Sequence, residues 1–432
     1  MKRTKILALI GSLLVAVAFV TPSALAGGID LYEISAPDVG LASAGYAAGA
    51  QDASTLFKNP AGMSLLNGAQ VESSLQVLYG NAHFSGNSKT TTAGGNGDNA
   101  IGALPGASLF ITYPVTEKLT VGFGTFSYFG LSENYGNDWA GRYYIQKATL
   151  LGMSLMPAAS FKVNDWLSVG GGLNVMYGYL DAQTAVRTSI FNPSPSNDGQ
   201  MKLKDEEWGF GGNAGIMIQP RPGTRIGVNY LSEVKLNFSA KPSFSGVNGT
   251  ALGLLPVFKN PPQLNLGMTV PQSVMVGVYQ DLNKQWAVMA DVGWQNWSRF
   301  GEVGVGVDSS TGLIADAKPT TINLHYDDTW HGAIGAQYKA SEQWQFTGGF
   351  AYDTSAVSDA NRTVTLPMGE SYRFGLGTLW KYSKSLDLEA AYELAWSGDM
   401  PVTQTSTYRG TVSGTYDNVY FMFFSVGLNW RF

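Results

Sequence analysis

Apolar and polar residues alternate along many short stretches of this chain, with the period of two that puts one set of side chains on each face of a β-strand. In residues 386–396, Leu388 and Tyr392 fall on the apolar face, while Asp387, Glu389 and Glu393 fall on the other. The same alternation recurs elsewhere, most regularly over residues 286–295, 344–353 and 420–432. The pattern predicts an all-β protein whose strands have one apolar face and one hydrated face.

The links between these stretches are of two kinds. Six are tight turns, at residues 116–118, 164–165, 220–224, 283–284, 341–342 and 383–385. Seven are longer loops rich in Gly, Ser, Thr, Asn and Asp, at residues 86–105, 131–147, 191–205, 241–268, 300–328, 354–368 and 398–415. Six short and seven long links in alternation join fourteen strands, with the short turns at one end of the sheet and the long loops at the other.

An even strand number, short turns at one end, long loops at the other and an apolar outer face are typical of an outer-membrane barrel. Its closed sheet leaves no unpaired edge in lipid. Aromatic residues next to the short turns favour the same architecture, because they form a girdle at one interface: Tyr113, Trp166, Trp286, Tyr338, Trp344 and Tyr382. We therefore predict a 14-stranded antiparallel transmembrane β-barrel over residues 67–432, with both chain ends on the periplasmic side.

A soluble β-sandwich is the competing architecture, since its two apolar faces would pack on each other. Several charged residues fall on the face opposite the apolar one, at Asp291, Arg373, Asp387, Glu389 and Glu393. A filled core has little room for these charges, whereas the lumen of a barrel accommodates them.

Composition and the N-terminus indicate export. Only 14% of the 432 residues are charged, where about 25% is usual, and cysteine is absent. A basic start, an apolar run and the small residues that end at Ala26 form a signal peptide over residues 1–26. Loss of its three cations takes the net charge from −5 to −5 − 3 = −8, which argues against a nucleic-acid partner. No apolar run of 18 residues follows, so no transmembrane helix is expected.

Residues 27–66 precede the first strand and have no membrane-spanning role, so we expect them to fold inside the lumen as a hatch. Residues 40–50 are mostly Ala and Gly, which suits close packing against the wall. A short helix over about 53–57 should end at Asn59-Pro60, because the proline ring excludes the residue before it from the α region.

Several long stretches resemble the FadL family of outer-membrane long-chain fatty acid and hydrocarbon transporters (the OmpP1/FadL/TodX group). They include DLYEISAPDVGLASAGYAAGAQDASTLFKNPAGM, FGLSENYGNDWAGRY, VPQSVMVGVYQDLNKQWAVMADVGWQNWSRF and a final strand that ends at Phe432. The likeness covers nearly the whole mature chain, with the segments in the family's order.

The resemblance implies a fourteen-stranded barrel with an N-terminal hatch, through which a hydrophobic ligand diffuses passively and leaves sideways by a gap beside a kinked third strand. The hatch motif of the family matches Asn59, Pro60 and Ala61. The kink glycine matches Gly130, and the acidic partner of the hatch matches Asp353, so we expect Asn59 to face the wall beside these two residues.

This chain departs from the family pattern at the ligand pocket. Ile29 stands where the family has an aromatic residue near the mature N-terminus. Where the family holds a fatty carboxylate with basic side chains, this chain has Thr184, with Arg187 three residues on, and His325 before the tenth strand. An apolar loop segment could gather ligands of either kind, through Leu252, Leu254, Leu255 and Phe258.

The resemblance thus implies passive uptake of hydrophobic compounds across the outer membrane of a Gram-negative bacterium, with long-chain fatty acids as the first candidate and neutral aromatic or aliphatic hydrocarbons as the alternative. A general porin and a surface adhesin are alternatives of another class. Phosphate-loop and HExxH motifs and metal-spaced Cys or His clusters are absent, so we expect no cofactor and no metal site. A hydrolase would need a Ser–His–acid set, for which His331 near Asp327 and Asp328 is the candidate; we predict no enzyme. A monomer in contact with outer-membrane lipid is expected.

Overall fold

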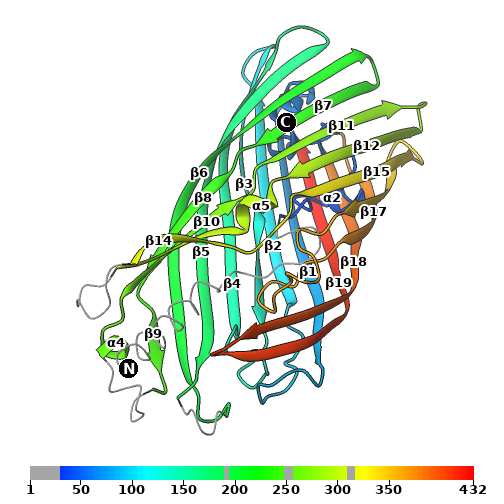
Figure 1. The fold of residues 1–432 in the computed structure, drawn as a ribbon. Coiled ribbons are helices and arrows are strands. Elements are labelled where there is room, and N and C mark those ends of the chain that lie inside the picture. The colour runs from blue at the N-terminus through cyan, green and yellow to red at the C-terminus, as the bar shows by residue number, and fades with distance from the viewer. Residues whose placement is uncertain (1–29, 189–193, 248–255, 309–316) are drawn as a thin grey trace.

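The computed structural model describes residues 30–188, 194–247, 256–308 and 317–432. Fourteen antiparallel strands form a closed barrel (Figure 1), because each pairs with its neighbours along the chain and the first pairs with the last. The strands are β1(Gln70–Gly86), β2(Gly102–Pro114), β3(Leu119–Asn134), β4(Lys147–Lys162), β5(Leu167–Val186), β6(Gly199–Arg221), β7(Thr224–Leu231), β11(Ser273–Asp281), β12(Trp286–Gln295), β15(Thr329–Lys339), β16(Trp344–Asp353), β17(Ser371–Lys381), β18(Leu386–Ser406) and β19(Gly410–Arg431). The predicted fold class is confirmed.

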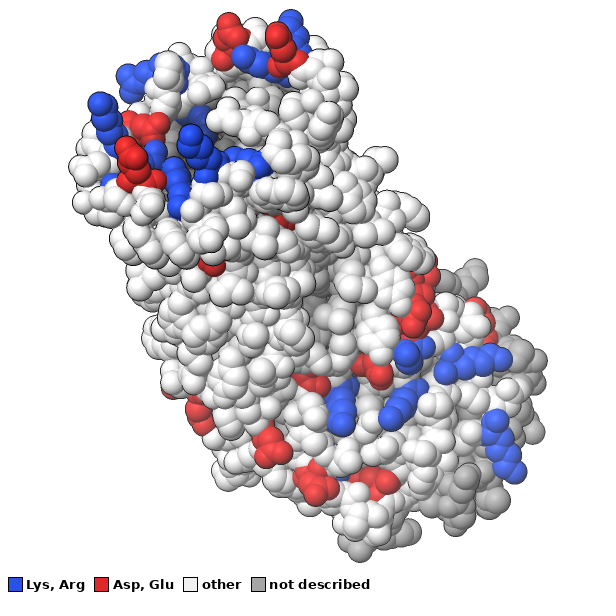
Figure 2. Space-filling view, turned by 180° about the vertical axis from the view of Figure 1, so that it is seen from behind, with Lys and Arg blue, Asp and Glu red and all other residues white. Residues whose placement is uncertain are grey.

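Alternation along the strands places apolar side chains outside and polar side chains inside. Leu376 is 67% exposed and Val426 57%, whereas Glu393 is 0% and Asp291 3% exposed. Figure 2 shows charged residues gathered toward the two ends of the molecule, with a broad band between them that is nearly free of charge. Such a band is what the hydrocarbon layer requires of a barrel surface. None of the helices in the described part of the chain is long and apolar enough to cross a membrane.

Two of the predicted long loops contain further strands. The link from β7 to β11 holds β8(Val234–Ala240), β9(Ser243–Ser245), α4(Pro256–Lys259) and β10(Gln263–Val270), and the link from β12 to β15 holds α5(Trp297–Phe300), β13(Glu302–Asp308) and β14(Ala317–Asn323). Four of these strands form a second sheet, in the order β14-β13-β10-β8. Its apolar residues Leu236, Phe238 and Leu266 are buried, and Leu236 and Phe238 lie against Gly178 of β5.

The prediction of a long loop at residues 398–415 is wrong. β18 and β19 continue as one long hairpin whose last register pair is Ser406 with Gly410 (Figure 1). The extension is stable because alternate residues of it, Met400, Val402 and Val412, are buried. The six tight turns are found where they were predicted.

The N-terminal hatch lies inside the barrel and consists of α2(Ala36–Gly40), α3(Thr55–Lys58) and the 3₁₀ helix η1(Pro60–Leu65). The helix end predicted at Asn59-Pro60 is present, with Asn59 in an extended conformation at φ −164°. The structure describes residues 30–66 of the predicted hatch, and the exact domain boundaries stay a prediction.

Glycines on the inner wall allow the hatch backbone to approach the strands directly. A Cβ atom on Gly349 would collide with the carbonyl oxygen of Leu41, and one on Gly227 would collide with that of Ala47. We call the wall glycines with hatch atoms next to them the glycine seat: Gly122, Gly170, Gly215, Gly227, Gly277, Gly335, Gly349, Gly375, Gly377 and Gly427. Glycine within a strand weakens it and often marks a place where another backbone comes close. The many glycines on this wall are therefore explained by the close approach of the hatch.

Candidate functional site: a window in the wall and a pocket behind it

The ladder between β2 and β3 is incomplete. Their pairing runs from Pro114–Thr120 to Leu109–Thr125 and then ends. Beyond this point residues 102–108 of β2 pair with β1 but not with β3, and residues 126–134 of β3 pair with β4 but not with β2. We call this unpaired part of the wall the window.

A β-bulge at Tyr128 accompanies the window, because the β3–β4 register shifts between Ser127 and Phe129. The bulge turns both Tyr128 and Phe129 inward, where they are 2% and 1% exposed. Gly130 follows with φ +141°, a backbone conformation that other residues rarely adopt. On the opposite edge of the window lies Pro105 of β2, which is paired with Val77 of β1 and has no backbone N–H to donate.

The start of the hatch pairs with the bulge. Asp30 forms an antiparallel bridge with Phe129, and the Leu31 amide donates to the Tyr128 carbonyl at 2.7 Å. At the end of the window nearest the long loops, the Asn134 amide donates to the Ala100 carbonyl at 2.7 Å, and this bond bounds the unpaired region. The window is therefore a bounded opening in the ladder, with its inner side in contact with the hatch.

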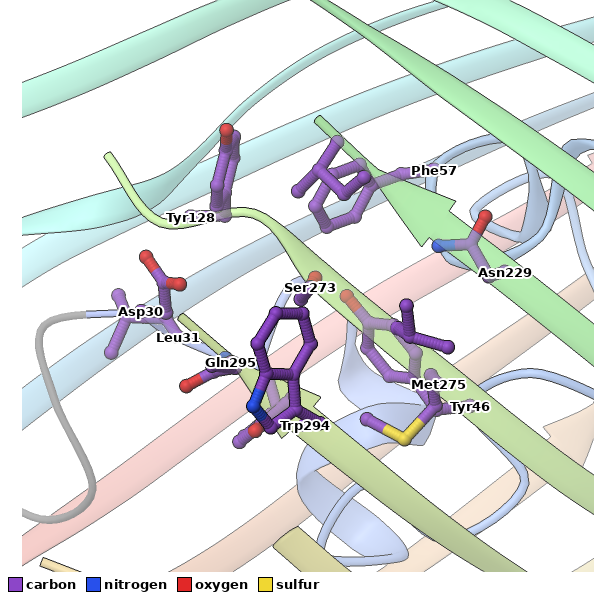
Figure 3. A pocket seen from close by; sticks show the side chains of 13 residues that line it. Asp30, Leu31, Tyr46, Phe57, Tyr128, Asn229, Ser273, Met275, Trp294 and Gln295 are labelled. Atoms are coloured by element: carbon purple, nitrogen blue, oxygen red, sulfur yellow. The ribbon is translucent and has the colours of Figure 1, made fainter. Parts of the chain in front are cut away.

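A pocket lies behind the window, between the hatch, the bulge and the ends of β7, β11 and β12. It encloses about 430 Å³ of space not filled by protein, part of it open to solvent. Five aromatic side chains line it: Tyr32, Tyr46, Phe57, Tyr128 and Trp294. Figure 3 shows Tyr128, Phe57 and Trp294 approaching it from three different elements.

The polar groups of the pocket are few, and none is cationic among its described lining residues. They are Asp30, Asn229, Ser273 and Gln295, together with the tyrosine hydroxyls. Burial raises the pKa of the Asp30 carboxyl well above its usual range. Neither a basic side chain nor a histidine lines the pocket, so it offers a carboxylate ligand no counter-ion.

A buried network of charged residues links the hatch to the wall next to this pocket. The Arg373 guanidinium donates to Asp353 at 2.6 Å, to Glu393 at 3.3 Å and to Glu33 of the hatch. The Tyr32 ring packs on the His331 ring at a centroid distance of 4.3 Å, and the Arg373 guanidinium lies over the face of the Tyr32 ring. We call Glu33, His331, Asp353, Arg373 and Glu393, together with Ser43, the hatch latch.

Ser43, His331 and Asp353 have the order of a hydrolytic triad. His331 Nε2 lies 3.0 Å from the Ser43 hydroxyl and Nδ1 lies 2.7 Å from Asp353. The acid bonded to His331 is thus Asp353 rather than Asp327 or Asp328, and the Asp328 carboxylate accepts from Trp294, Asn296 and Ser298. A triad needs a substrate carbonyl at the serine, but Ser43 is 1% exposed and does not line the pocket. The three side chains therefore link the hatch, through Ser43, to the barrel wall, through His331 and Asp353.

Asn59 contacts the wall at a different place from the one predicted. Its amide donates to the Ala47 carbonyl at 2.8 Å and to the Ile216 carbonyl of β6 at 3.0 Å, and its oxygen accepts from Ala61 at 3.1 Å. The expected contacts with Gly130 and Asp353 are not among these bonds: Asp30 and Leu31 pair with Phe129 and Tyr128 next to Gly130, and Glu33 is linked to Asp353 through Arg373.

The predicted ligand residues lie outside the described pocket. Thr184 is buried at the extracellular end of β5, and the Arg187 guanidinium lies 4.9 Å from the Tyr143 ring centroid. His325 is exposed, with φ +57°. Phe258 packs edge-on against Phe244 at 4.8 Å. The remaining predicted positions, Ile29, Leu252, Leu254 and Leu255, fall outside the described residues.

Sequence reasoning missed the pocket residues Asp30, Asn229, Ser273 and Trp294. The one available signal in the sequence was that Asn229, Ser273 and Trp294 lie near strand ends next to a long loop. Across the described ranges, Asp, Glu and His residues form no cluster of three that could hold a metal ion.

Comparison with known proteins supplies the family. The family described as "Outer membrane protein transport protein (OMPP1/FadL/TodX)" matches residues 17–432. The chain belongs to this family. The long-chain fatty acid transport protein of Escherichia coli O6:H1 is 26% identical over 409 residues, which cover 88% of this chain and 90% of that protein.

Solved structures of FadL-type proteins share the fold. A Pseudomonas aeruginosa FadL homologue has a TM-score of 0.83 at 20% identity and covers 94% of this chain and all of its own. The Ralstonia pickettii toluene transporter TbuX has a TM-score of 0.63 at 21% identity, over 93% of this chain and 99% of its own. This FadL-type chain is therefore a transport protein of the outer membrane.

Proposed function

We propose that this protein carries hydrophobic compounds into the outer membrane by passive diffusion, and that they leave sideways through the window between β2 and β3. The single observation that supports this most strongly is the end of the β2–β3 ladder at Leu109 and Thr125. An unpaired ladder within the membrane costs free energy unless it lines a cavity or is covered by protein, so such a gap points to a function.

The pocket connects to this exit. Leu31 and Tyr128 belong both to the pocket lining and to the hydrogen bond at the bulge, so a ligand in the pocket adjoins the window. Leu180 of the wall and Leu236 and Leu264 of the second sheet are buried in the apolar core of the extracellular half of the barrel. Transfer of an ion into such apolar surroundings is costly, whereas transfer of a hydrophobic ligand is not.

Neutral compounds suit the described pocket better than fatty carboxylates. No described lining residue is a cation, so a ligand carboxylate would be buried there without a counter-ion, which costs free energy. Solved relatives include a toluene transporter, which agrees with a neutral aromatic cargo.

A long-chain fatty acid is the second candidate, and Arg187 favours it. The Nε atom of Arg187 is buried without a hydrogen-bond partner at the extracellular end of β5. A carboxylate could bind there before the chain enters the lumen. The fatty acid transport protein of E. coli among the relatives agrees with this reading.

Uptake measurements test the proposal. A host that lacks its own FadL-type protein should take up radiolabelled toluene, or oleate for the second candidate, faster when it expresses this chain. The same purified protein in a planar bilayer should conduct almost no ions, because the hatch fills the lumen. Uptake at the rate of the empty host, or a large steady ion current, would contradict the proposed function.

A further inference from the structure

The pocket behind the window contains two buried oxygen atoms without hydrogen-bond partners. Asp30 is 8% exposed and Asn229 5%, and the Oδ1 atom of each is unpaired. Figure 3 shows the two side chains in the pocket wall, Asp30 at the start of the hatch and Asn229 on β7. A buried acceptor that lacks a donor costs free energy, so a ligand that brings a donor removes this cost.

Asp30 cannot easily turn away from the pocket. Its backbone pairs with Phe129, and the next amide, that of Leu31, donates to the Tyr128 carbonyl at 2.7 Å. The backbone at Asp30 is therefore fixed before a ligand arrives, which lowers the entropy cost of binding.

The charges around the pocket disfavour an anion. The Arg373 guanidinium lies 5.4 Å from the Tyr32 ring centroid and is already bonded to Glu33, Asp353 and Glu393. A ligand carboxylate would thus find no free cation among the described lining residues.

We propose that the pocket selects neutral aromatic compounds that carry a hydroxyl group, and that Asp30 is the residue that bonds this hydroxyl. The inference rests on the proposed function, because it names the class of cargo that the channel prefers. The aromatic ring of the ligand packs among the five aromatic side chains of the lining, and its hydroxyl hydrogen satisfies the unpaired oxygen of Asp30. Because burial raises the pKa of Asp30, its neutral carboxyl can also donate to the ligand oxygen, as a hydroxyl both donates and accepts.

Four ligands of nearly the same shape test this proposal. The purified full-length protein in detergent is titrated calorimetrically with p-cresol, toluene, 4-methylanisole and p-toluate, and each heat is corrected for partition into protein-free micelles. We expect p-cresol to bind about tenfold tighter than the other three, the effect of one well-placed buried hydrogen bond. Toluene lacks the hydroxyl, 4-methylanisole only accepts, and p-toluate is an anion.

Variants assign the preference to Asp30. Asp30→Leu should reduce p-cresol binding to the level of toluene, while Asp30→Asn, which can still donate and accept, should keep the preference. Asp98→Leu removes an exposed acid elsewhere and should change nothing. If Asp30→Leu does not fold, Asp30→Ala, which also removes the carboxyl group, should likewise reduce p-cresol binding to the level of toluene.

The outcomes separate this inference from the function on which it rests. Equal affinity for p-cresol and 4-methylanisole, tightest binding of p-toluate, or an unchanged preference in Asp30→Leu would overturn the inference. If none of the four ligands binds but cells still take up toluene, the inference is overturned and the channel function stands. Absence of both binding and uptake overturns both.

Discussion

Replacement of Arg373 by methionine should release the hatch. Arg373 is 3% exposed and is the cation that holds Asp353 and Glu393 of the wall together with Glu33 of the hatch. Without it, the buried Glu33 and Glu393 lose their cation and Asp353 keeps only His331 as a partner, which costs about 3–5 kcal/mol. Since about 1.4 kcal/mol is a factor of ten, the ratio of displaced to seated hatch should rise at least about a hundredfold.

Single-channel recording in a planar bilayer measures this ratio directly, because a displaced hatch opens the lumen to ions. We expect Arg373→Met to open frequently and Glu33→Gln, which changes only the hatch side, to open less often. The matched control is Arg299→Met, whose exposed pair with Glu302 is worth about 0–1 kcal/mol and lies outside the latch. Each barrel is checked for folding by its migration in unheated gels.

A folded Arg373→Met protein that stays as closed as the wild type would refute the reasoning. The hatch would then be held by its other contacts with the wall, such as the glycine seat, Asn59 and the bonds of the Gly45 and Ala47 amides to Asp291, and the latch would add nothing to its stability.

Three further perturbations test the seating of the hatch. Gly349→Val puts a side chain where the hatch backbone lies, at a cost of about 1–3 kcal/mol, and should raise ion conductance, whereas Gly332→Val, with no atom near its added Cβ, should not. Asn59→Leu loses its bonds to two backbone carbonyls, each worth about 0.5–1.5 kcal/mol, and should speed hydrogen exchange of the hatch amides about tenfold or more; unchanged exchange would contradict the contact. Burial alone would lower the pKa of Lys58, but its 2.5 Å ion pair with Asp38 and other nearby acids raise it above its ordinary value of 10.5. The pair therefore stabilises the hatch below about pH 10.5 and is lost as the pH rises through the higher pKa of the folded state, so wild-type channels should open in strong alkali. The Lys58→Met channel should lack this alkaline transition, and its persistence would disprove the assignment.

The barrel could be predicted from the sequence because the alternation that defines it is local. Each strand shows an apolar and a polar face within ten residues, and the turns between strands carry their own residue types. The hairpin over 398–415 was missed because Gly398, Pro401 and many Thr and Ser residues resemble a loop. What keeps it extended is the burial of Met400, Val402 and Val412, which depends on surfaces remote in the sequence.

The candidate site was harder to predict for the same physical reason. Asp353 was expected to meet the hatch, and it does so through Arg373 and His331 rather than through Asn59. The partner of a buried carboxylate is decided by the path of the hatch through the lumen, which no local pattern encodes. The pocket combines Asp30 with strand ends from β7, β11 and β12, so only the closed barrel brings its side chains together.

The most direct test of lateral exit is to tie the two edges of the window together. The chain has no cysteine, so Ala107→Cys and Ser127→Cys can be joined across the window by a bifunctional maleimide. The control pair, Ile111→Cys and Phe123→Cys, bridges the same two strands where their ladder is intact. We predict that the bridge across the window stops uptake of the hydrophobic ligand and the control bridge does not; equal uptake through both bridged proteins would contradict lateral exit.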